Sequence, residues 1–120
     1  MTHLIDLTFL CFPEYLTPTA SPNSGSAVIG DTSYVINCAI SGSPTATSWY
    51  WVKSPVNGNA ASTINQGTNN NKYTMGTNPT NPSLTIKSIT LDDDANYRCQ
   101  ATNIAGERAS NEARLLVTGG

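Results

Sequence analysis

Apolar and polar residues alternate along several short stretches of the chain, which predicts β-strands that bury one face. Between Thr32 and Ser41 every second residue belongs to one apolar row: Tyr34, Ile36, Cys38 and Ile40. Near the other end of the chain the same alternation runs through Ala113, Leu115 and Val117. A period of two with β-branched and aromatic residues is typical of a half-buried strand.

Turn sequences separate these stretches and divide the chain into short strands. The turn signals are Gly30-Asp31, Gly42-Ser43-Pro44 and Asn57-Gly58,. The expected strands lie at about 24–29, 32–41, 48–53, 62–65, 72–75, 83–87, 96–102 and 109–118. No helix longer than a single turn is predicted, at 91–94. The fold class is therefore all-β.

Two cysteines frame a tryptophan within this pattern of strands. Cys38 precedes Trp51, and a D-x-A-x-Y-x-C string starts at Asp93 and ends with Tyr97 and Cys99. This layout resembles the immunoglobulin superfamily. The resemblance implies a Greek-key β-sandwich with one inter-sheet disulfide between the two cysteines. It also implies that Trp51 and Tyr97 belong to the core, with Trp51 on the sulfur atoms.

The residues after the second cysteine narrow the resemblance. The C-x-A-x-N-x-x-G run from Cys99 to Gly106 is similar to the intermediate set, or I-set, of the superfamily. The long stretch between Trp51 and Leu84 adds some V-set character, because it leaves room for an additional strand. The chain as a whole resembles the immunoglobulin-like domains of invertebrate surface or secreted recognition proteins.

The domain boundaries follow from composition and from the extent of this resemblance. Residues 23–118 form the predicted immunoglobulin-like domain, and 119–120 resemble a linker. Residues 1–22 are interpreted as a leader or linker, either vector-derived or contributing an extra strand. Their Cys11 is left over by the predicted disulfide, so it is a candidate thiol for an inter-chain bond,.

Charge and hydropathy exclude two classes of partner. The chain of 120 residues has 12% charged residues and a formal net charge of −2, which gives no electrostatic basis for binding nucleic acid or an anionic membrane,. No apolar run reaches the ~18–20 residues of a membrane helix. Membrane contact is expected only through an anchor outside this sequence.

A disulfide favours an oxidising compartment, hence a secreted or cell-surface location. The alternative is an intracellular domain with reduced thiols.

No catalytic set is found, so the chain is not expected to be an enzyme or to need a cofactor. The only histidine is His3, which excludes a Ser-His-Asp or Cys-His arrangement within the domain,. The cluster 92–94 of three aspartates is interpreted as a corner rather than a calcium site,. There Asp93 is predicted, from the family resemblance, to pair with Lys72, while Asp92 and Asp94 are solvated.

The remaining features predict recognition through a protein surface. Tyr50, Ile104 and Glu107 are the candidate contact residues, because an exposed tyrosine and an apolar hairpin tip favour protein contacts,. Alternatively, Ile104 folds over Trp49 and closes the core. Proline at the middle position of 78–80 and 81–83 excludes N-glycosylation at both Asn-x-Ser/Thr sites,. The predicted function is extracellular adhesion or immune-type recognition, with a protein ligand or homophilic self-association as a homodimer; the alternative is a spacer in a tandem array.

Overall fold

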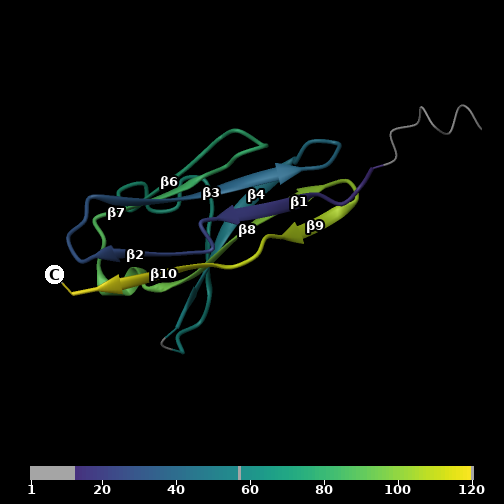
Figure 1. Cartoon of the computed structure of the whole chain (residues 1–120). Coiled ribbons are helices and arrows are strands. Elements are labelled where there is room, and N and C mark those ends of the chain that lie inside the picture. The colour runs from purple at the N-terminus through teal and green to yellow at the C-terminus, as the bar shows by residue number, and fades with distance from the viewer. Residues whose placement is uncertain (1–12, 57, 120) are drawn as a thin grey trace, which may run out of the picture.

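The protein is a two-layer β-sandwich in the computed structural model, which describes residues 13–56 and 58–119 (Figure 1). The first sheet has four strands in the order β1 (Thr17–Ser21), β3 (Ser33–Ser41), β7 (Leu84–Lys87) and β6 (Tyr73–Met75). The second sheet has the order β2 (Ser24–Val28), β10 (Ala113–Thr118), β8 (Ala95–Asn103), β4 (Ser48–Pro55) and β5 (Ser62–Ile64), and β9 (Gly106–Ala109) also pairs with β8. A single 3-10 turn, η1 (Leu91–Asp93), precedes β8. The all-β sandwich predicted from the sequence is confirmed.

The chain enters the sandwich earlier than the predicted boundary at residue 23. β1 pairs antiparallel with β3, and β2 then crosses to the other sheet and pairs parallel with β10. The inward side chains of β1, Pro18 and Ala20, are buried, so this stretch contributes to the core. A proline is tolerated there because β1 lies at a sheet edge. Residues 1–12, with His3 and Cys11, lie outside the described residues, and the inter-chain thiol stays a prediction.

The predicted last strand at 109–118 is divided into two. Ser110 lies between β9 and β10, where its hydroxyl accepts a hydrogen bond from Cys99 N at 2.9 Å. The next residue, Asn111, bonds both Ala20 N (2.9 Å) and Ala20 O (3.0 Å) on β1. Ser110 N still donates to Cys99 O at 2.8 Å, and the side-chain bonds of Asn111 tie the two sheets together at this edge,.

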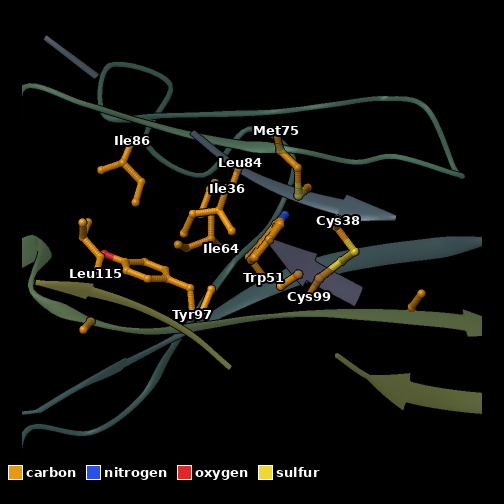
Figure 2. Packing of buried hydrophobic residues seen from close by; sticks show 14 of the residues in the cluster. Ile36, Cys38, Trp51, Ile64, Met75, Leu84, Ile86, Tyr97, Cys99 and Leu115 are labelled. Carbon is orange, nitrogen blue, oxygen red and sulfur yellow. A yellow bond between two sulfur atoms is a disulfide. The ribbon is translucent and has the colours of Figure 1, made fainter. Parts of the chain in front are cut away.

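The core is centred on a disulfide between the sheets. Cys38 on β3 and Cys99 on β8 are bonded, with 6.3 Å between their Cα atoms, and both are fully buried. Trp51 stands opposite Cys99 in the β4–β8 register, and Figure 2 shows its ring beside the bond. Its indole N–H donates to Pro82 O at 2.9 Å. Trp49, one layer away, is only half-buried and donates to Gly76 O at 3.2 Å. The predicted inter-sheet disulfide is confirmed.

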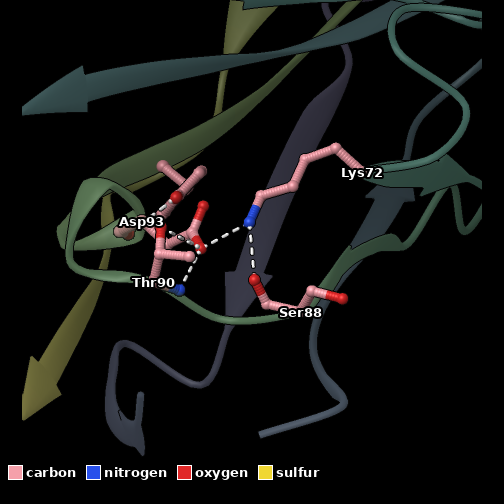
Figure 3. Close-up of polar contacts among 5 residues, drawn as sticks. Lys72, Ser88, Thr90 and Asp93 are labelled. Atoms are coloured by element: carbon pink, nitrogen blue, oxygen red, sulfur yellow. Dashed lines mark hydrogen bonds and ion pairs between the residues drawn. The ribbon is translucent and has the colours of Figure 1, made fainter. Parts of the chain in front are cut away.

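A polar corner closes the end of the sandwich at η1 (Figure 3). The predicted pair is formed: Lys72 Nζ lies 2.6 Å from Asp93 Oδ2, and Asp93 is fully buried. The same oxygen accepts Thr90 N at 2.8 Å, and Lys72 also donates to Ser88 O at 3.0 Å. Asp93 Oδ1 has no hydrogen-bond partner among the described residues. The Tyr97 hydroxyl donates to Asp93 O at 2.7 Å, which ties β8 to the η1 turn that precedes it,.

Asp94 is not the solvated turn residue that the sequence predicts. Its Oδ1 lies 2.6 Å from Arg114 Nη2, and its Oδ2 accepts Val117 N at 2.8 Å. Burial by itself opposes ionisation of this carboxylate. The hydrogen bonds from Val117 and Arg114 and the charge of Arg114 outweigh that cost, so the pKa of Asp94 lies below 3.8,. Asp94 therefore links the start of β8 to β10.

An Asp94→Asn variant should lose about 1 kcal/mol of unfolding free energy at neutral pH, a modest figure because the pair is partly exposed. The folded-state pKa of Asp94 is lowered, so its contribution is fully present above the unfolded-state pKa near 3.8 and is lost as pH falls through the folded-state value,. Urea titrations between pH 7 and pH 2 should show the two proteins converging below about pH 3.8. A difference that stays constant down to pH 2 would contradict this role.

Candidate binding surface

The outer face of the six-stranded sheet carries the candidate contact residues. Along β8 the side chains alternate strictly, so that Arg98 and Gln100 face outward while Tyr97, Cys99 and Ala101 face the core. Tyr50 on β4 stands opposite Gln100, and Glu107 on β9 stands opposite Thr102. Three neighbouring strands thus bring these side chains to one surface.

A chain of polar contacts crosses this face, and we name its five residues, Tyr50, Arg98, Gln100, Glu107 and Glu112, the outer-face network. Tyr50 Oη donates to Glu107 Oε2 at 2.7 Å and accepts Gln100 Nε2 at 3.0 Å. Arg98 Nε donates to Gln100 Oε1 at 3.1 Å, and Arg98 Nη1 lies 3.6 Å from Glu112 Oε2. The bond to Glu107, with smaller effects of burial and of the Glu107 charge, raises the pKa of Tyr50,. Tyr50 therefore stays a neutral hydrogen-bond donor at physiological pH.

The β8–β9 hairpin projects Ile104 into solvent. Ile104 is 79% exposed, so the alternative in which it folds over Trp49 is wrong. The hairpin is held from inside by Asn103, which is nearly fully buried. Its side-chain Nδ2 donates to Glu14 O (2.8 Å) and Pro44 O (3.1 Å), and its side-chain Oδ1 accepts a hydrogen bond from Ala105 N (2.9 Å). These bonds hold the tip in place, and with it the outward position of Ile104.

The other side of the hairpin rests on the segment before β1. The Arg108 guanidinium lies 3.5 Å from the centroid of the Tyr15 ring, a cation–π contact,. A Cβ atom on Gly106 would come within 2.9 Å of Tyr15 Cε1, and the Gly106 φ of +136° also favours glycine,. The hairpin is thus fitted closely against the Tyr15 ring, and the charge of Arg108 is directed toward that ring.

A match to a family model assigns the chain to a protein family. The chain matches the model of the immunoglobulin I-set domain over residues 19–117. The chain belongs to the immunoglobulin I-set family. Members of this family are typically non-enzymatic binding modules. No curated protein matches the chain closely enough to count as a relative. The match begins inside β1, which agrees with a sandwich that starts before residue 23.

The predicted site residues of this I-set domain fall into separate places. Tyr50 and Glu107 come together on the outer face, and Ile104 stands at the hairpin tip three residues before Glu107. Lys72 and Asp93 lie at the η1 corner. Within residues 13–56 and 58–119, no three His, Cys, Asp or Glu side chains gather into a metal-binding group. In the same ranges, no helix is long and apolar enough to cross a membrane.

Several residues of this surface were not identified from the sequence. Gln100 could have been found, because strict alternation from Tyr97 and Cys99 places it outward. Glu112 could not, since it belongs to the unpredicted break between β9 and β10. Tyr15 was not identified, because residues 1–22 were interpreted as a leader or linker, or as an extra strand, and were given no contact residues. Its contact with Arg108 joins positions 93 residues apart, which no local pattern reveals.

Proposed function

We propose that this I-set domain is an extracellular recognition module that binds a protein partner through the outer-face network and the Ile104 hairpin tip. The observation that carries the proposal is the 79% exposure of Ile104 on a hairpin held by buried Asn103. A solvent-exposed apolar side chain on a hairpin whose backbone is held by hydrogen bonds favours association, because little backbone entropy is lost on binding.

The disulfide supports the extracellular part of this proposal. Cys38 and Cys99 form a fully buried bond, which indicates an oxidising environment during folding,. Secreted and cell-surface proteins fold in such an environment. Adhesion and immune-type recognition are the roles that a non-enzymatic module of this family would perform there.

A spacer role in a tandem array is the second candidate, and one observation favours it. Val28, Ile29 and Leu91 are 42%, 41% and 61% exposed. Val28 stands beside Thr118 in the β2–β10 register, and η1, which contains Leu91, packs against β10. An apolar end of this kind would be covered by an adjoining domain.

Ile104→Ser and Tyr50→Ala should weaken association at least tenfold without lowering the melting temperature by more than about 2 °C. Leu91→Ser is the matched control, since it removes an exposed apolar side chain at the other end of the sandwich. The measurements are light scattering over a concentration series for self-association, and binding of peptides selected from a random phage-displayed library for partner recognition. Lower stability with unchanged association would assign Ile104 and Tyr50 to packing. Sensitivity to Leu91→Ser alone would favour the spacer.

A further inference from the structure

The lysines and arginines of this chain are mostly engaged within the domain itself. All six lie among the described residues. Lys72, Arg98 and Arg114 face carboxylates, at 2.6, 3.6 and 2.6 Å respectively. Arg108 stacks on the Tyr15 ring, and Lys87 donates to Asn70 O at 3.0 Å. The net charge of the outer face therefore depends on the carboxylates there that have no lysine or arginine partner.

Glu107 is the carboxylate of the outer-face network with no ion pair among the described residues, although Arg108 Nη1 donates to its backbone oxygen at 3.3 Å. Its partner Tyr50 is neutral and bonds only Oε2, at 2.7 Å. No lysine or arginine within the described ranges lies within ion-pair distance of Glu107, whereas Glu112 on the same face is paired with Arg98. Glu107 is exposed, and the Tyr50 bond fixes its orientation. An oriented carboxylate with one free oxygen is a ready acceptor for a cationic side chain.

We infer that the partner of this surface presents a lysine or arginine beside an apolar side chain, with the cation at Glu107 and the apolar group at Ile104. This inference rests on the proposed function. The two anchors are three residues apart on one hairpin, so a short segment of a partner protein can reach both,. Charge complementarity at Glu107 adds orientation and specificity to the apolar contact.

The same charge distribution favours a different protein over a second copy. The two cations without a carboxylate partner or ring contact in the described ranges, Lys53 and Lys87, are only half exposed. Lys53 stands opposite core-facing Tyr97 in the β4–β8 register, so its side chain leaves the backbone on the core-facing side of the sheet. Two copies would also each carry a formal net charge of −2. Within residues 13–56 and 58–119, each cation of a second copy is half-buried, paired with a carboxylate or, like the exposed Arg108, stacked on a ring.

A random phage-displayed peptide library, selected on the immobilised full chain, tests this inference. The expected result is enrichment of lysine or arginine next to an aliphatic or aromatic residue. Individual selected peptides should bind Glu107→Gln about tenfold more weakly, with an affinity that no longer falls with added salt. Glutamine keeps the shape and the acceptor for Tyr50. Asp92→Asn is the matched control, because it removes an exposed carboxylate in η1, outside the outer-face network, and it should change binding less than twofold.

The possible outcomes distinguish a failure of the cationic partner from a failure of the proposed binding surface itself. Peptides that depend on Ile104 but show no basic enrichment, or bind Glu107→Gln unchanged, overturn the cationic partner and leave the surface intact. A library that yields no peptide sensitive to Ile104→Ser or Tyr50→Ala overturns both. Concentration-dependent dimerisation that Glu107→Gln abolishes overturns the choice of a different protein. Melting temperatures of all variants should match the unmodified chain, which excludes misfolding as the cause.

Discussion

Replacing Cys38 and Cys99 together by alanine should lower the free energy of unfolding by about 4 kcal/mol. The bond spans 61 positions, so it removes much of the loop-closure entropy of the unfolded chain,. Both sulfur atoms are fully buried against the core that contains Trp51, and alanine would leave a small cavity there,. Guanidinium titrations followed by Trp51 and Trp49 fluorescence would give the loss directly.

The control is the unmodified chain unfolded and refolded under reducing conditions. Its stability should fall to about that of the double-alanine variant, because both lack the same cross-link. A double variant within 1 kcal/mol of the oxidised protein would show that the sheets are held by packing alone. In that case the disulfide would say little about the compartment in which the protein folds.

Lys72→Met should lower the free energy of unfolding by about 2 kcal/mol, the second largest loss expected. It keeps the aliphatic stem but leaves Asp93 as a buried carboxylate without its cation. Removing one member of a fully buried pair typically costs about 3–5 kcal/mol. The smaller figure follows from the Lys72 side chain, which is 21% exposed and therefore partly screened by water,.

A double-mutant cycle with Asp93→Asn isolates the pair from its surroundings. Asparagine can still accept the hydrogen bond from Thr90 N, so the turn before β8 keeps that contact. The sum of the two single-variant losses in unfolding free energy should exceed the loss in the double variant by at least about 1 kcal/mol, because each single substitution removes the same interaction. Strict additivity would mean that the 2.6 Å contact contributes no coupling energy to the η1 corner.

The candidate surface was only partly predictable from local pattern. Tyr50 and Glu107 were identified by their residue types, but their hydrogen bond depends on β9 pairing with β8 next to β4. The exposure of Ile104 was left open between two interpretations. Asn103 decides it, through bonds to Glu14 O and Pro44 O from two other parts of the chain. Such bonds join residues 89 and 59 positions apart, so no short-range pattern encodes them.

By itself, the sequence determined the strands and their buried faces, and its resemblance to the immunoglobulin superfamily implied the sandwich, the disulfide and the Lys72–Asp93 pair. The alternation around Cys38, the Trp51 position and the Tyr97-x-Cys99 spacing are local patterns, and burial of one strand face follows from them directly. Tertiary structure decided where the fold begins, since β1 gains its place only by pairing with β3. It also decided that Asp94 binds Arg114 and that Ser110 interrupts the last strand. These features depend on which backbone groups and charges of distant strands meet, and a linear pattern does not contain that information.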